Sequence, residues 1–114
     1  MQPAQHRLVV ALLAVPDITA STIYGMFDFF ASAGRDWAFL TTGVPGEQWV
    51  QPLVVTVDGA RFRAANGVWI QPDCALVDCP APDIVCVPEI FVAPDDDIAG
   101  RYDAETQWLA TCYE

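Results

Sequence analysis

The strongest constraint on this chain is an uninterrupted apolar run, Leu8–Val15, that stops at Pro16. A run with no polar residue on either face is typical of a parallel strand covered by helices on both sides. The stretch Asp83–Ile90 repeats the pattern, because its four apolar residues run directly into Pro88. We therefore predict two fully buried parallel strands whose carboxyl ends lie side by side.

An acidic residue follows each predicted strand, Asp17 after the first and Glu89 after the second. Open α/β sheets bind ligands in the crevice beyond the carboxyl ends of such strands. We predict that Asp17, Ile18, Glu89 and Ile90 line this crevice, where two carboxylates favour an amine or another cation. The alternative role for Asp17 is capping of the helix that follows.

The segment after the first strand predicts a helix from about Thr19 to Ala33, closed by Gly34. Its aromatic residues favour packing against the sheet over an aromatic binding site. The apolar segment Trp37–Thr41 then predicts a second strand. It completes a right-handed β-α-β unit within the first 42 residues.

The middle of the chain alternates short β-prone pieces, from Val54–Val57 to Val68–Ile70, with the turn dipeptides Asp-Gly and Asn-Gly. These dipeptides predict a small β-hairpin excursion between the parallel strands. Arg61 and Arg63 fall on one face of it. They predict either an anion site or edge charges that discourage association between sheets.

The last third predicts a short helical segment at Cys74–Asp78 and an amphipathic helix at Tyr102–Tyr113, on either side of the second parallel strand. Three consecutive aspartates at Asp95–Asp97 lie in the loop before the last helix, without the glycine and glutamate spacing of an EF-hand. From this length and these elements we expect residues 1–114 to form one α/β domain.

Composition narrows the possible functions. The 114 residues include 15 acidic residues and five arginines, for a formal charge of −10, which disfavours direct contact with nucleic acid. No apolar run reaches the length of a membrane span, and no signal peptide is recognisable. The four cysteines form no C-x-x-C pair and there is one histidine. We expect no metal, no cofactor and a reducing cytoplasmic location.

The order of these elements resembles the ThiJ/PfpI family of the class I glutamine amidotransferase-like superfamily, and most closely the N-terminal sensor domain of AraC-type transcriptional regulators. The resemblance implies a flavodoxin-like three-layer sandwich with a mostly parallel sheet, in a truncated version that spans 1–114. Four segments of the sequence carry it, namely Val9–Ala20, Gly25–Phe30, Asn66–Ile70 and Pro82–Pro88, and Gly100–Tyr102 and Glu105–Leu109 continue it.

Three departures from the family's catalytic pattern stand out. Thr22 takes the position of a supporting acidic residue, and Pro88-Glu89-Ile90 replaces a Pro-Gly-Gly-type loop. A glutamate there would oppose an oxyanion. No cysteine lies at the strand-to-helix elbow that carries the family's nucleophile. The resemblance therefore implies no catalytic residues and a non-catalytic domain that senses a ligand or binds a partner.

Two other functions remain open from the sequence. One is an enzyme of the superfamily, a hydrolase, hydratase or glyoxalase-like protein, and the other is a stand-alone small protein that self-associates. A sheet that ends after these strands exposes an edge, so we expect a homo-oligomer. The partners expected are thus a small-molecule effector and a second copy, with no membrane and no nucleic acid.

Overall fold

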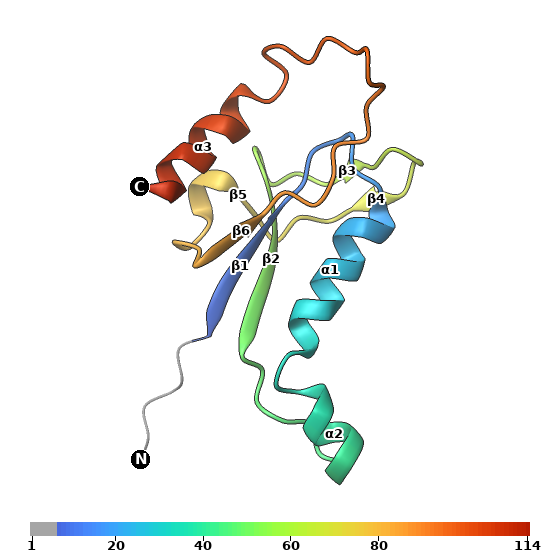
Figure 1. Ribbon diagram of the computed structural model, residues 1–114, viewed down its shortest axis with the longest axis vertical. Helices are drawn as coiled ribbons and strands as arrows, with labels where there is room; N and C mark the ends of the chain where they lie inside the picture. The colour runs from blue at the N-terminus through green and yellow to red at the C-terminus, as the bar shows by residue number, and fades with distance from the viewer. Residues whose placement is uncertain (1–6) are drawn as a thin grey trace.

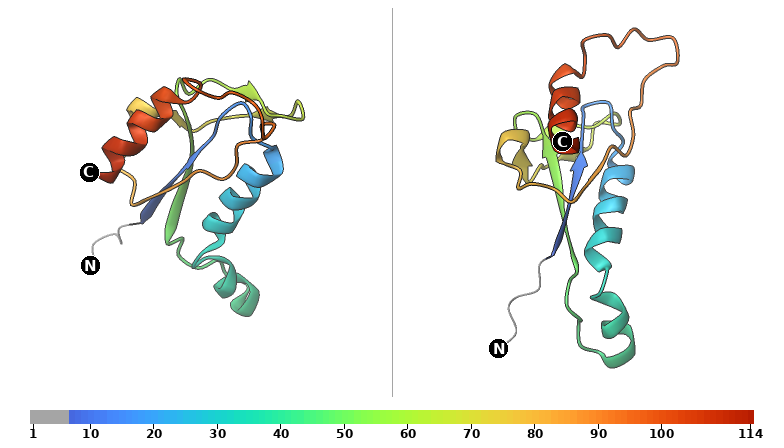
Figure 2. Two further views of the ribbon diagram at one scale, coloured as in Figure 1. Left: turned by 45° about the horizontal axis from the view of Figure 1, so that its top comes forward. Right: turned by 60° about the vertical axis from the view of Figure 1, so that its left-hand side comes forward.

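The computed structural model describes residues 7–114 and shows an α/β sandwich of three layers (Figure 1). Its sheet has four parallel strands in the order β5-β2-β1-β6, and a separate antiparallel hairpin joins β3 to β4. Helix α1 covers one face of the sheet and α3 lies on the other (Figure 2). The flavodoxin-like fold class is confirmed. The strands are β1 (Leu8–Leu13), β2 (Val50–Thr56), β3 (Phe62–Arg63), β4 (Trp69–Ile70), β5 (Cys74–Ala75) and β6 (Ile84–Cys86).

Strand β1 lies at the centre of the sheet, as its apolar sequence predicts. It pairs with β2 from Leu8↔Val50 to Leu13↔Val55, and with β6 from Val10↔Ile84 to Leu12↔Cys86. Its alternate side chains enter two different cores: Val10 and Leu12 pack with α1, whereas Ala11 and Leu13 pack on the α3 side. Full burial of a Val or Leu side chain contributes about 1.5–3 kcal/mol, so β1 anchors both layers.

Helix α1 (Ala20–Ser32) confirms the predicted helix to within one residue at each end. Ile23 is fully buried against the sheet, and Phe27 and Phe30 pack beside it. Phe29 points to the solvent with 72% of its surface exposed. Packing, not an aromatic site, therefore accounts for most of the helix's apolar face.

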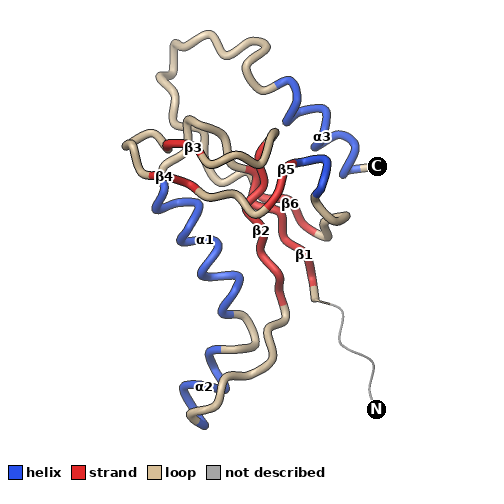
Figure 3. The backbone as a smooth tube through the Cα atoms, turned by 180° about the vertical axis from the view of Figure 1, so that it is seen from behind, coloured by secondary structure: helices blue, strands red, loops and turns tan. Residues whose placement is uncertain are grey.

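The predicted second strand at Trp37–Thr41 is wrong, because these residues form helix α2 (Asp36–Thr42). Gly43 ends α2 with a φ of 79°, and its N–H donates to the carbonyl of Phe39 at 2.8 Å. The large side chains of Trp37 and Leu40 are 76% exposed, so they never reach the core. Figure 3 shows α2 well away from the hairpin, at the far end of α1.

Strand β2 is the true partner of β1, so the β-α-β unit closes later than predicted. The sequence signal was obscured by Pro52, which lacks an N–H and is rare in central strands. Here the backbone of Val54 faces the β5 side, where it exchanges hydrogen bonds with Asp73. The backbone nitrogen of Pro52, two residues earlier, faces the same side. At that level β5 has not yet begun, so β2 has no strand partner there among the described residues. The proline therefore removes no hydrogen bond from the ladder.

The Asn-Gly hairpin prediction is confirmed. Gly67 adopts a φ of 82° in the turn between β3 and β4, and the N–H of Ala64 donates to the carbonyl of Val68 at 2.8 Å. The hairpin sits beyond the start of α1, since the N–H of Ala65 donates to the carbonyl of Ile18 at 2.8 Å. The piece Val54–Val57, predicted as part of this excursion, instead belongs largely to the main sheet.

The last third of the chain differs from prediction in two places. Cys74–Asp78 is helical only at η1 (Leu76–Asp78), because Cys74–Ala75 form the edge strand β5. Strand β6 is parallel, as predicted, but it is not fully buried, since it lies at the other edge and Ile84 is 46% exposed. Helix α3 (Asp103–Tyr113) confirms the final amphipathic helix. No helix within residues 7–114 has the length and hydropathy to cross a bilayer.

Candidate functional site

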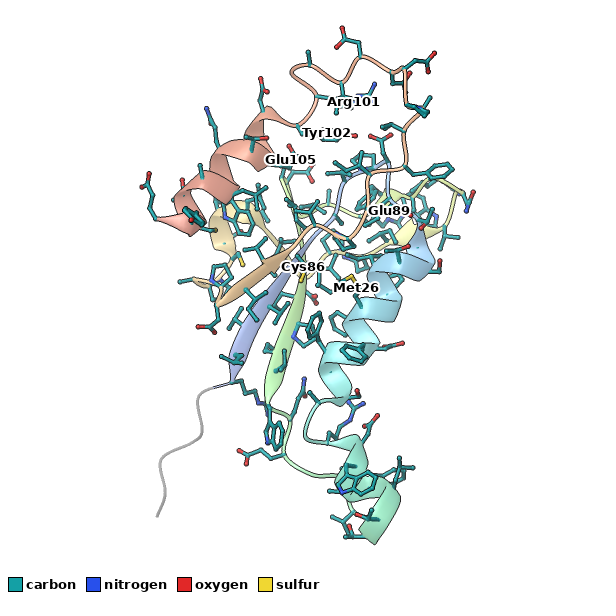
Figure 4. The ribbon with its side chains drawn as sticks, viewed as in Figure 1. Met26, Cys86, Glu89, Arg101, Tyr102 and Glu105 are labelled. Atoms are coloured by element: carbon teal, nitrogen blue, oxygen red, sulfur yellow. The ribbon has the colours of Figure 1, made fainter. Side chains whose placement is uncertain are left out.

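The carboxylate of Glu89 binds the N-terminus of α1. Its Oε1 accepts hydrogen bonds from the Thr19 hydroxyl at 2.6 Å and from the Thr19 N–H at 3.0 Å. The Thr19 hydroxyl also lies 2.9 Å from that of Thr22. These bonds, first the one from the Thr19 side chain, lower the pKa of Glu89. Figure 4 shows Glu89 at the start of α1, so the carboxylate has a structural role that needs no ligand.

The carboxylate of Asp17 is also bound by other side chains of the protein, but it does not cap α1. Its Oδ2 accepts a hydrogen bond from the Tyr102 hydroxyl at 2.6 Å and lies 3.7 Å from the Arg101 guanidinium. Burial, followed by this hydrogen bond, raises the pKa of Tyr102. The contact ties the segment before α3 to the loop after β1.

The two apolar residues predicted for the crevice have separate environments. Ile18 is fully buried in the core between α1 and the hairpin, whereas Ile90 is 39% exposed. The structure thus brings Asp17 and Glu89 to the same edge of the sheet. It engages both carboxylates with protein groups and places Ile18 out of reach of a ligand.

An open cleft lies nearby, between the loop after β2 and the start of α3. Its volume is about 490 Å³, and it lies beyond the carboxyl ends of β1 and β2. This is the position at which open α/β sheets bind ligands. Its walls carry charges of both signs, from Asp58, Arg61, Arg101, Asp103 and Glu105.

Glu105 is the unusual member of this cleft. Its side chain points from the first turn of α3 toward the ends of β1 and β2 (Figure 4), and only 9% of its surface is exposed. Among residues 7–114 its carboxylate has no hydrogen-bond or ion-pair partner. No enclosed side-chain oxygen in this part of the chain lacks a partner, so the Glu105 carboxylate is reached from the open cleft. It is therefore available to a group that supplies hydrogen-bond donors or positive charge.

Arg61 provides the opposite charge on the other wall. Its guanidinium lies 4.4 Å from the ring centre of Trp69, and it has no carboxylate partner in the described part of the chain. Arg63 stacks on the same ring at 4.5 Å, but it donates to the carbonyl of Gly67 at 3.0 Å and does not line the cleft. Arg61 and Glu105 face the same space without forming an ion pair with each other.

The cleft contains few groups for covalent chemistry. Its one hydroxyl-bearing side chain is that of Thr56, which is buried and accepts a hydrogen bond from the Gly59 N–H at 2.9 Å. Within residues 7–114 no three histidine, cysteine or acidic side chains gather closely enough to hold a metal ion. The geometry therefore favours recognition of charge.

No family model matches the chain, and no curated protein matches it.

The sequence did carry a signal for Glu105. The residues of α3 that face the second core, Trp108 and Leu109, follow Glu105 at helical spacing, so an acidic residue occupies the apolar face of the helix. Such a position predicts a carboxylate at the border of the core. The unpaired state of Arg61 had no comparable signal, because it depends on which side chains the fold brings near it.

Proposed function

We propose that this chain is a ligand-binding domain that senses a small molecule without catalysing a reaction, like the sensor domain of the AraC-type regulators that it resembles. The ligand occupies the cleft between the loop after β2 and α3. The single observation that carries the proposal is that Glu105 and Arg61 line this one cleft with opposite charges, and neither has an ion-pair partner within residues 7–114.

The ligand bears a positive group for Glu105 and a negative group for Arg61. An ammonium or guanidinium at Glu105 forms a charged hydrogen bond with a carboxylate that has no other partner in the described residues. A carboxylate or phosphate at Arg61 meets a guanidinium that is pre-positioned by stacking on Trp69. A zwitterion of the size of an amino acid satisfies both groups at once.

A non-catalytic role is supported by the state of the cysteines and of Glu89. Burial raises the pKa of the thiols of Cys74, Cys79 and Cys112, which makes them poor nucleophiles at neutral pH. Glu89, at the loop where the family's Pro-Gly-Gly-type sequence is expected, is bound to α1. A cytoplasmic location fits unpaired thiols, and the acidic composition disfavours nucleic acid as a partner.

Self-association through β6 is the second part of the proposal. The outer edge of β6 is unpaired within the described residues, and Ile84 and Val87 beside it are exposed. An open edge of this kind favours pairing with another copy. Sedimentation that shows only monomer at high protein concentration would refute this part without affecting the ligand cleft.

The ligand proposal is tested by calorimetric titration of the protein with a panel of amino acids, together with amines and carboxylates of matched size. We expect zwitterions to bind best, with Glu105→Gln and Arg61→Gln each weakening affinity at least about tenfold, since a charged hydrogen bond contributes about 1.5–3 kcal/mol. Asp28→Asn, on the exposed face of α1, and Arg63→Gln, on the same tryptophan but outside the cleft, serve as controls. Unchanged affinity in both cleft variants, or binding of anions alone, would overturn the assignment.

A further inference from the structure

Three of the four cysteines lie near one another on the α3 side of the sheet. Cys74 in β5 and Cys79 after η1 both pack against the second core, which includes Leu76 and Trp108. Cys112 follows Trp108 by four residues and therefore lies on the same side of α3. Cys86 is separate, because it packs on the α1 side.

The short helix η1 folds Cys79 back toward Cys74. The N–H of Cys79 donates to the carbonyl of Leu76 at 3.3 Å, which closes the turn, and the thiol of Cys79 donates to the carbonyl of Pro80 at 3.2 Å. The side chains of Cys74 and Cys79 are neighbours that interact electrostatically. The two cysteines thus flank one short turn and pack against the same core. Neither is engaged in a disulfide, and all four cysteines are free.

We propose that Cys74 and Cys79 are a redox pair that closes an intramolecular disulfide when the protein meets a low-molecular-weight disulfide such as glutathione disulfide. The thiolate of Cys74 attacks one sulfur of the reagent, forms a mixed disulfide and releases one glutathione thiolate. The thiolate of Cys79 then attacks the Cys74 sulfur and expels the second glutathione. The two thiol protons leave, the protein loses two electrons, and the reagent is reduced to two thiols.

The environment assigns the order of attack. Burial raises the pKa of both thiols, that of Cys79 to about 11, and at Cys74 the neighbouring Cys79 side chain partly opposes the rise. Cys74 is therefore the better first nucleophile, and Cys79 is the resolving thiol. Because burial also raises the pKa of Cys74, closure is slow at neutral pH and accelerates as the pH rises.

The test incubates the reduced full chain with glutathione disulfide, traps remaining thiols with N-ethylmaleimide and maps the products by mass spectrometry. A protease that cleaves before aspartate suits the sequence, because Asp73, Asp78, Asp83 and Asp103 place the four cysteines in separate peptides. We expect loss of two of the four thiols and one linked pair, Cys74 with Cys79, formed faster at pH 9 than at pH 7. A Cys79–Cys112 link, stable glutathione adducts alone or no loss of thiols would each overturn the proposal.

Matched variants separate the pair from general thiol oxidation. Cys79→Ser is expected to leave a glutathione adduct on Cys74, and Cys74→Ser is expected to form no disulfide within the turn. Cys86→Ser removes a thiol on the opposite side of the sheet and is expected to behave as the wild type. If Cys86→Ser lost the disulfide to the same extent as Cys74→Ser, the assignment would be contradicted.

Discussion

The carboxylate of Glu89 accepts two hydrogen bonds from Thr19, one from the hydroxyl at 2.6 Å and one from the backbone N–H at 3.0 Å. A residue beyond the end of β6 therefore caps α1, although the two are far apart in the sequence. Negative charge at a helix N-terminus is favourable. The contact joins the edge strand to the helix on one face of the sheet.

Replacing Glu89 by glutamine should lower stability in a pH-dependent way. The pKa of Glu89 is lowered in the folded protein, so its contribution is present above the pKa of the unfolded state, about 4.3, and is lost as the pH falls through the folded value. We expect the urea midpoint of Glu89→Gln to be lower than that of the wild type at pH 7. The two midpoints should converge as the pH falls through the lowered pKa of Glu89. Glu47→Gln, at an exposed position, is the control, and a difference independent of pH would contradict the assignment.

Replacing Tyr102 by phenylalanine should loosen the segment that leads into α3. The substitution removes the hydrogen bond to Asp17 and keeps the ring, at a cost of about 1 kcal/mol for a partly exposed bond to a charged group. We expect faster amide hydrogen exchange in residues 92–102 and a small fall in the melting temperature. Tyr113→Phe, where the side chain is 95% exposed, should have no effect on either measurement.

Replacing Gly34 by alanine should be more damaging than the same change at Gly67. Both residues have a positive φ, 79° and 82°, which costs an alanine about 1–2 kcal/mol. A Cβ at Gly34 would also approach the carbonyl of Glu47 and the ring of Trp49, whereas a Cβ at Gly67 meets open space. Urea unfolding of the two variants therefore separates the conformational cost from the steric one. Equal destabilisation would show that Trp49 and Glu47 move aside freely.

Replacing Val54 by alanine should be costly, whereas Leu40→Ala should be nearly neutral. Val54 is 1% exposed in β2, and the loss of two methyl groups with the cavity that remains costs about 2 kcal/mol. Leu40 is 76% exposed on α2, where alanine is an equally good helix former. Chemical unfolding of both variants tests which segment is the second strand. A large cost at Leu40 would restore the strand predicted at Trp37–Thr41.

The elements that the sequence predicted well are those with a local signal. Periodicity located α1 and α3, the Asn-Gly dipeptide located the hairpin, and an unbroken apolar run located β1. The second strand was wrongly predicted in the segment that forms α2, and β2 was missed, because two local signals were misleading. Trp37 and Leu40 have the composition of a strand but are left in solvent, and Pro52 is tolerated in β2 because its side of the ladder is open at that point.

The candidate site was predictable only in its position. The carboxyl ends of the parallel strands were the correct edge to search, and Asp17 and Glu89 do lie there. Their partners, Tyr102 and Thr19, depend on the tertiary fold, so the sequence could not show that both carboxylates are already bound. Glu105 becomes a candidate only when its place on the apolar face of α3 is combined with the cleft beside it.

The central place of β1 also has a consequence for protein synthesis. This strand is translated before both of its neighbours, since it pairs with β2 and with β6, whose last residues are Thr56 and Cys86. Its backbone hydrogen-bonding groups and apolar side chains therefore lack these partners until Cys86 has been translated, and α3, which covers one face of the sheet, follows later still. An early apolar strand with late partners is a natural binding segment for a ribosome-associated chaperone.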